Sequence, residues 1–230
     1  MKQFVTTGII LTRTDFGEAD RILTLLTPDY GKLHLVAKGV RRVKSKLAGG
    51  IELFSVSNII YTPGRGDLGT LISTRLITYY RHIVEDIERT MLGYELIRQL
   101  HRITEDEPEP DYFTLLEHAF VALDDPEVDL GIIRTWFAMR LLQLNGYTPN
   151  LRTDKLGNPL QATSTYDFNL DDSAFVVSEN GPYHADHIKF LRLGFSSSTP
   201  KLLNQVQGSS TLMQVCAPLV ATMLSTLLRV

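Results

Sequence analysis

The chain has a single cysteine, Cys216, among its 230 residues. One cysteine excludes an intrachain disulfide and a zinc site built from cysteines alone, and it is typical of proteins from a reducing cytoplasm. Residues 1–10 contain one lysine and no long apolar segment before a small-residue cleavage site, so we expect no signal peptide. Hydrophobic residues make up 43% and charged residues 21% of the chain, which indicates a globular protein with a real core.

The sequence also lacks the motifs of common enzymes: a nucleophile elbow, a Walker loop and a His-Glu-x-x-His stretch. Residues 64–69 match the Gly-x-Gly-x-x-Gly string of dinucleotide-binding proteins, but that mechanism needs a helix directly after the string. Residues 70–73 have the pattern of a strand instead, so we interpret 64–69 as a hairpin loop. We therefore expect no catalytic residues, no cofactor and no enzymatic activity.

A stretch without charge lies near the end of the chain. No charged residue stands between Lys201 and Arg229, and residues 212–228 are largely apolar, although Pro218 and several polar residues interrupt them. A membrane-spanning helix needs about 20 apolar residues, so we predict a mostly buried core helix that bends or ends a first turn at Pro218. A tail anchor and a partner-binding helix are the alternatives. The residues expected to share its buried face are Leu212, Val215, Leu219, Met223 and Leu227, broadened by Cys216 and Val220.

Charge is unevenly distributed along the chain, although the formal net charge is only −3. Residues 1–82 contain 12 Lys and Arg against 6 Asp and Glu, a net charge of +6. Residues 83–230 contain 11 against 20, a net charge of −9. Such asymmetry predicts two domains with different partners.

The first eighty residues have the pattern of short strands. Runs rich in β-branched residues, separated by turn signals such as Pro28-Asp29-Tyr30-Gly31, predict five strands. These strands cover residues 4–12, 21–27, 33–37, 52–62 and 69–79. They leave no room for crossover helices, so an antiparallel barrel or sandwich is expected, and five strands fit an OB-fold barrel.

From residue 83 onward the apolar period becomes helical. Helices are predicted over residues 83–100, 112–123, 130–144, 185–193, 200–206 and 212–228. Residues 147–185 are rich in polar residues, Gly and Pro, and should form an irregular insert with one hairpin-like apolar run at residues 174–177. The predicted fold class is α+β and multidomain: a five-stranded OB-fold barrel in domain 1–80, then an all-helical domain in 81–230 that carries the insert.

The strongest functional signal is a cationic segment. No acidic residue stands between Gly31 and Ile51. Basic residues that neutralise phosphates release counterions, so a mobile cationic loop here should bind nucleic acid without sequence preference and with strong salt dependence. A solvated loop that binds nothing is the alternative. The candidate DNA-binding residues are Lys32, Lys38, Arg41, Arg42, Lys44 and Lys46.

Aromatic residues close to this segment in sequence can stack on bases if they are exposed. Aromatic side chains dominate small β-cores, so a core position is the commoner outcome for each of them. The candidates are Phe16, Tyr30, His34, Phe54 and Tyr61.

One short cluster contains metal-ligating side chains. His184-Ala185-Asp186-His187 offers two imidazoles and a carboxylate. A structural zinc site needs four ligands, commonly as two distant pairs, and residues 153–157 add only Asp154. We expect no metal site and leave open whether His184 and His187 bind any ion.

Several blocks of the sequence, in this order and spacing, resemble the N-terminal signature of the RecO family. Residues 94–96 and 141–151 resemble the helical half of the family more loosely. The resemblance implies an OB-fold followed by a helical domain, binding of single- and double-stranded DNA, and DNA contact at Lys38, Arg41, Arg42 and Lys46. It also implies a cytoplasmic, nucleoid-associated protein that anneals strands and works with RecR and the single-stranded DNA-binding protein to load RecA. The N-terminal blocks are residues 14–23, 30–32, 36–42, 45–47 and 53–55.

The sequence departs from the family at the zinc site that many members carry. There the family has a Cys-x-x-Cys-Gly string and a second Cys-x-x-Cys pair downstream. The matching positions here are Thr153 and Leu156, then His184 and His187. The first pair cannot bind zinc, so the insert at about 147–185 is expected to be a degenerate zinc finger that holds by packing alone.

We therefore predict a DNA-binding recombination mediator in DNA repair, without membrane contact, whose acidic helical domain recruits proteins. An OB-fold adaptor that acts mainly through protein–protein contacts is one alternative, and failure of residues 1–80 to bind DNA would favour it. An OB-fold RNA-binding factor is another, which competition between single-stranded DNA and RNA would separate.

Overall fold

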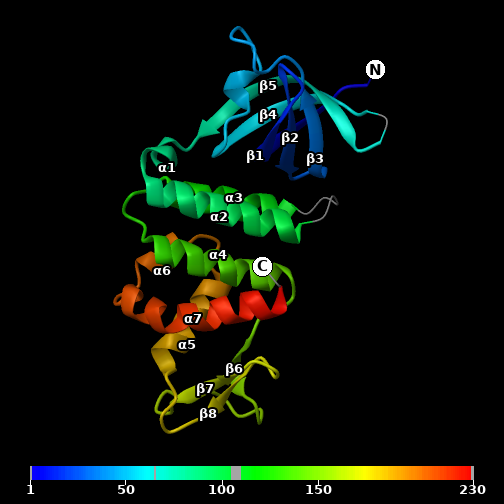
Figure 1. Ribbon diagram of the computed structural model, residues 1–230. Helices are drawn as coiled ribbons and strands as arrows, with labels where there is room; N and C mark the ends of the chain where they lie inside the picture. The colour runs from blue at the N-terminus through cyan, green and yellow to red at the C-terminus, as the bar shows by residue number, and fades with distance from the viewer. Residues whose placement is uncertain (1, 65, 105–109, 229–230) are drawn as a thin grey trace. The chain divides into compact units, whose positions relative to one another are not determined.

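The structure is a computed structural model that describes residues 2–64, 66–104 and 110–228. The chain divides into two compact units, Met1–Asp124 and Asp125–Val230. Figure 1 labels the elements of both units. This division keeps the three helices that follow the strands in the first unit, whereas the domain boundary at residue 80 follows the change in sequence periodicity and stays a prediction.

A closed barrel of five strands forms most of the first unit. The order around the barrel is β1-β2-β3-β5-β4, and every neighbouring pair is antiparallel except β3 with β5. That is the arrangement of an OB-fold, so the predicted barrel is confirmed. The strands are β1 (Phe4–Phe16), β2 (Asp20–Thr27), β3 (Gly31–Ala37), β4 (Ser55–Thr62) and β5 (Leu68–Tyr79).

The barrel core consists mainly of aliphatic side chains, and in β1, β2 and β4 several consecutive residues are buried. Buried members include Leu23, Leu25, Leu35, Ile59 and Leu71. A hairpin joins β4 to β5, and β5 begins at Leu68, within the glycine-rich string at 64–69, so that no helix follows the string. The string is therefore the hairpin loop that the sequence predicted; Arg65 within it lies outside the described residues.

Helices α1 (Arg81–Glu85), α2 (Ile87–Ile103) and α3 (Pro110–Leu123) complete the first unit. Phe54 connects them to the barrel: its buried ring lies edge-on to Tyr94 of α2 and Phe120 of α3, with centroids 5.2 and 5.5 Å apart. Gly93 makes room for this ring, because a Cβ atom at that position would lie 2.5 Å from Cε1 of Phe54. The barrel and these helices thus share an aromatic cluster.

The second unit is built on α4 (Leu130–Leu144), which is buried on nearly every side and contains Trp136 and Phe137. Helices α5 (Ala185–Ser196), α6 (Lys201–Asn204) and α7 (Ser209–Leu227) pack around it, and α5 also contacts α7. A helix that is apolar all round belongs in a core. The predicted helical domain is confirmed in this unit.

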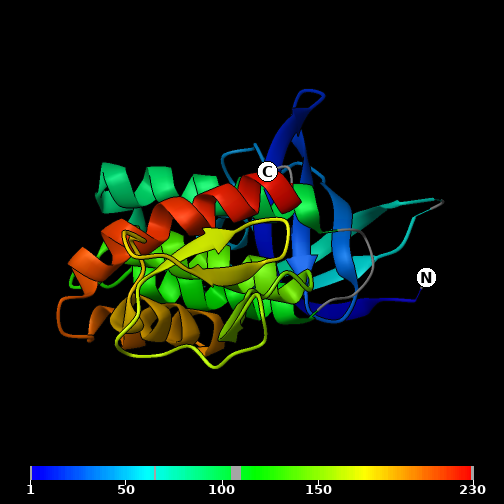
Figure 2. The ribbon, with the colours of Figure 1, turned by 90° about the horizontal axis from the view of Figure 1, so that it is seen from below.

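The insert between α4 and α5 is more regular than the sequence suggested. It contains a sheet of three short strands in the order β6-β8-β7, whose hairpin is the yellow pair in Figure 2. Around Phe175 lie the rings of Phe168, Tyr183 and Tyr166, with centroids 5.1, 5.6 and 6.1 Å away. The strands are β6 (Asn150–Asp154), β7 (Tyr166–Asn169) and β8 (Ala174–Val177).

Helix α7 buries one face only, so the expectation of a mostly buried helix is wrong. The buried residues are close to the predicted stripe, and Leu212, Val215 and Leu227 at its ends are half-buried. The helix also continues through Pro218, which excludes a helix end there. By length and composition alone it is the one helix among the described residues that could cross a membrane, a test that core helices of soluble proteins also pass. Its buried residues are Cys216, Leu219, Val220, Met223 and Leu224.

Candidate nucleic-acid interface

Residues 38–47, which follow β3, form what we call the cationic loop. It is built from successive turns, in which the N–H of Arg42 donates to the carbonyl of Gly39 (3.1 Å) and the N–H of Ser45 to the carbonyl of Arg42 (3.0 Å). Gly39 has a φ of +64°, a conformation that glycine adopts without strain. The segment expected to be a mobile loop is therefore a series of hydrogen-bonded turns.

The hairpin between β1 and β2 holds the base of the cationic loop. The carboxylate of Asp20 accepts a hydrogen bond of 2.7 Å from the N–H of Gly39, and the carbonyl of Ala19 accepts one of 2.9 Å from the N–H of Arg41. No pattern in the sequence indicates this role of Asp20, although the residue belongs to the block 14–23 that resembles the family. The loop is thus fixed to a second element of the barrel at its start.

Asp15 on the same hairpin neutralises part of the positive charge. Its carboxylate lies 2.8 Å from the guanidinium of Arg21 and 3.4 Å from that of Arg41. The hydrogen bond from Arg21, with the nearby charge of Arg41, lowers the pKa of Asp15 despite some desolvation. The carboxylate therefore stays ionised near neutral pH and offsets these two arginines.

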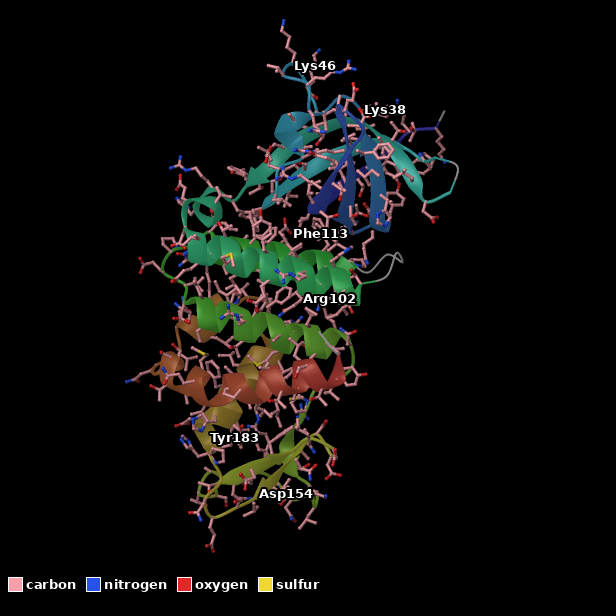
Figure 3. All side chains as sticks on the ribbon, in the orientation of Figure 1. Lys38, Lys46, Arg102, Phe113, Asp154 and Tyr183 are labelled. Carbon is pink, nitrogen blue, oxygen red and sulfur yellow. The ribbon has the colours of Figure 1, made fainter. Side chains whose placement is uncertain are left out.

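The six predicted DNA-binding residues fall into three groups. The side chains of Lys38, Arg42, Lys44 and Lys46 are exposed and make no ion pair within the part of the chain that the structure describes. Figure 3 shows Lys46 projecting from the loop. Arg41 is exposed but paired with Asp15, whereas Lys32 is half-buried on β3 and donates a hydrogen bond of 3.1 Å to the carbonyl of His101. The positive charges available to a ligand are therefore those of the first group, Lys38, Arg42, Lys44 and Lys46.

Of the five candidate stacking residues, one is exposed. Phe16, at the end of β1, has 51% of its surface exposed, whereas Phe54 and Tyr61 belong to the core. Tyr30 and His34 are half-buried. Phe16 lies next to Asp15 in sequence, on the hairpin that holds the cationic loop, and it is the one of these five whose ring is exposed.

The residues of the insert do not fit a zinc site. The turn at 153–157, where the family places its first cysteine pair, is organised by Asp154, whose buried carboxylate accepts hydrogen bonds from the N–H groups of Leu156 (2.9 Å) and Asn158 (2.8 Å). Burial alone would raise the pKa of Asp154, but these hydrogen bonds, together with the backbone of Gly157, lower it. A carboxylate therefore holds this turn.

His184 and His187 are close together, with ring centroids 3.9 Å apart. Nδ1 of His187 accepts a hydrogen bond of 3.2 Å from the N–H of His184, as in a capping box at the start of α5. Burial lowers the pKa of His187, and the neighbouring His184 adds to the effect. Among the described residues no group of three His, Cys, Asp or Glu side chains is arranged to hold a metal ion.

Comparison with known proteins gives matches over both units. The family model described as "Recombination protein O N terminal" matches residues 1–80, and "Recombination protein O C terminal" matches residues 84–207. The DNA repair protein RecO of Dehalococcoides mccartyi (strain CBDB1) is 32% identical over 214 residues, which cover 90% of this chain and 79% of that protein. The DNA repair protein RecO of Rubrobacter xylanophilus is 32% identical over 151 residues, 66% of this chain, and the match spans 60% of the relative's length.

Proposed function

Because the chain belongs to the RecO family of DNA repair proteins, we propose that it acts as a recombination mediator. In this role it binds single- and double-stranded DNA, promotes annealing of complementary strands and, with RecR and the single-stranded DNA-binding protein, helps to load RecA. It acts in the cytoplasm at the nucleoid, makes no covalent bond and needs no cofactor. The proposal assigns DNA contact to the cationic loop.

The observation that supports this assignment is the group of four exposed cations without ion-pair partners among the described residues: Lys38, Arg42, Lys44 and Lys46. An unpaired cation can neutralise a phosphate without first giving up a carboxylate partner. Two strands that approach such a surface repel each other less, because the loop screens their phosphates. Annealing follows from that screening alone.

Replacing these four residues with alanine in the full chain tests the assignment. The plot of log K for duplex DNA against log salt should become shallower by about 3–4, since each lost phosphate contact removes about 0.9 from the slope. Fluorescence anisotropy over a range of salt concentrations measures this slope.

Lys155 and Lys189 supply the matched control. Both are exposed lysines of the second unit, and each pairs with a carboxylate, Asp172 or Asp186. Their double alanine variant should keep the wild-type slope. An unchanged slope in the loop variant would remove the loop from the interface.

One observation favours the adaptor role as a second function. The end of β5 and the following helices expose apolar side chains, among them Ile77 (52%) and Ile87 (80%). Exposed apolar side chains that form a contiguous patch mark protein contacts, and we infer that these side chains belong to one. A variant with Ile77→Ser and Ile87→Ser, which adds no charge, should lose binding to RecR in gel filtration yet keep its DNA affinity; retained RecR binding would reject this surface.

A further inference from the structure

A groove lies on the first unit between β1 and α2. Its volume is about 480 Å³, which is within the size range of small-ligand sites. Its apolar lining comes from Leu11 of β1, from Ile97 of α2 and from Leu53, which precedes β4. Leu11 and Ile97 are buried. Met91 and Tyr94 line it from the same helix and are 66% and 42% exposed. The groove thus combines an apolar floor with an exposed aromatic ring.

The ring of Tyr94 packs against the buried ring of Phe54. It meets Phe54 edge-on, with an interplanar angle of 71°. Phe54 has a φ of +55°, a conformation rarely adopted by a bulky residue, and its ring is fixed between Gly93 and Phe120. Backbone strain of this kind persists only where the surrounding packing enforces it. Tyr94 is therefore a preorganised platform with an open side.

Two arginines line the groove, and they differ in their partners. Arg13 of β1 lies 3.0 Å from the carboxylate of Glu52 and also donates to the carbonyl of Ile51 at 3.4 Å. Arg98 of α2 is exposed and makes no ion pair within residues 2–64, 66–104 and 110–228. The positive charge of Arg98 is thus available to an anion.

The groove follows the cationic loop along the chain. The short 3-10 helix Ala48–Gly50 comes directly after the loop. It is followed by Ile51 and Glu52, which Arg13 contacts, and then by Leu53, which lines the groove.

We propose that this groove binds one unpaired nucleotide of a DNA strand, with the base on Tyr94 and Met91 and the phosphate on Arg98. The proposal rests on the proposed DNA-binding function and adds a site selective for single strands. In a duplex both faces of every base are covered by its neighbours, so stacking on Tyr94 requires an unpaired base. An exposed aromatic ring beside an unpaired guanidinium favours a nucleotide over an apolar peptide.

Tyr94→Leu and Arg98→Ala in the full chain test the groove, with anisotropy of labelled oligo(dT) and of a duplex as the readouts. Tyr94→Leu should weaken oligo(dT) binding about tenfold, the effect of losing one stacked base, and leave duplex binding unchanged. Arg98→Ala should lower the salt slope for oligo(dT) by about 0.7, the effect of one phosphate on a single strand. Arg102→Ala, on the same helix but outside the groove, is the control and should change neither.

A second measurement keeps the test decisive if Tyr94→Leu fails to fold. Irradiation of the wild-type complex with an oligonucleotide that contains 5-iodouracil should crosslink Tyr94 or Met91, as identified by mass spectrometry of the peptides. Unchanged oligo(dT) affinity in both groove variants, or an equal loss on duplex, would overturn the proposal and leave the groove to another ligand class such as a peptide. If the wild-type chain binds no DNA, the proposed function fails instead.

Discussion

Gly93 of α2 faces the ring of Phe54, and the packing of that ring against α2 requires a residue without a side chain at position 93. A Cβ atom at this position would lie 2.5 Å from Cε1 of Phe54, whose ring also packs against Tyr94 and Phe120. Gly93→Ala gains about 1 kcal/mol of helix propensity, but an overpacked core loses about 1–3 kcal/mol. We therefore expect a lower melting temperature by circular dichroism. Gly49→Ala, where no atom lies within 4 Å, is the control and should melt like the wild type.

His187 makes the stability of the second unit dependent on pH. Its Nδ1 accepts a hydrogen bond from His184, which requires an unprotonated nitrogen, and burial holds its pKa below 6.5. The unfolded chain then binds the proton more readily, so the folded state loses stability as pH falls below 6.5 towards the lowered pKa. The melting temperature should fall between about pH 7.5 and about pH 5.5, the range in which histidine titrates.

His187→Asn retains an acceptor at this position and removes the titration. That variant should show a flatter pH dependence of the melting temperature than the wild type. Equal slopes for His187→Asn and the wild type would show that another group titrates.

The turn at residues 153–157 of the insert should depend on the carboxylate of Asp154 for its stability. Asp154→Ala removes the acceptor for the backbone of Leu156 and Asn158, so the melting temperature should drop by several degrees, and Asp154→Asn should lose less because it keeps one oxygen. EDTA should leave the wild-type melt unchanged, and elemental analysis should find zinc well below one ion per chain. A chelator-induced drop as large as that of Asp154→Ala would contradict this account.

The long strands and helices could be predicted from the sequence pattern. The barrel strands were predictable because β-branched runs and turn residues alternate over the first eighty residues, and the helices because their apolar period is long. The apolar run at 174–177 marked β8, but β6 and β7 have only four or five residues each, too few for a period to emerge. Lys32 stands in the cationic run, yet only the fold shows that its amino group is bound to His101. Tyr94 follows an apolar helical stripe, but the barrel leaves it 42% exposed.

At the scale of the whole molecule, the shared aromatic cluster decides which fragment can stand alone. A fragment that ends after Asp124 keeps Phe54 and Tyr80 packed on Phe120. We expect it to melt cooperatively and to keep the salt slope of the full chain for DNA. A fragment of residues 1–80 exposes both rings and should aggregate, because each buried aromatic ring of this kind contributes roughly 1.5–3 kcal/mol.

Failure of residues 1–80 to bind DNA would therefore report a lost core and would not favour the adaptor role. Gel filtration and anisotropy on both fragments check this. A monomeric 1–80 fragment with full DNA affinity would show that the barrel needs no helix.

The single cysteine makes the chain suited to site-specific labelling. Burial raises the pKa of the Cys216 thiol to about 12, so almost no thiolate exists near neutral pH to react with a maleimide. Val43, in the middle of the cationic loop, is fully exposed and uncharged. A dye attached through Val43→Cys would therefore sit alone on the molecule, without removal of the native cysteine, and would report the arrival of DNA by its own change in brightness.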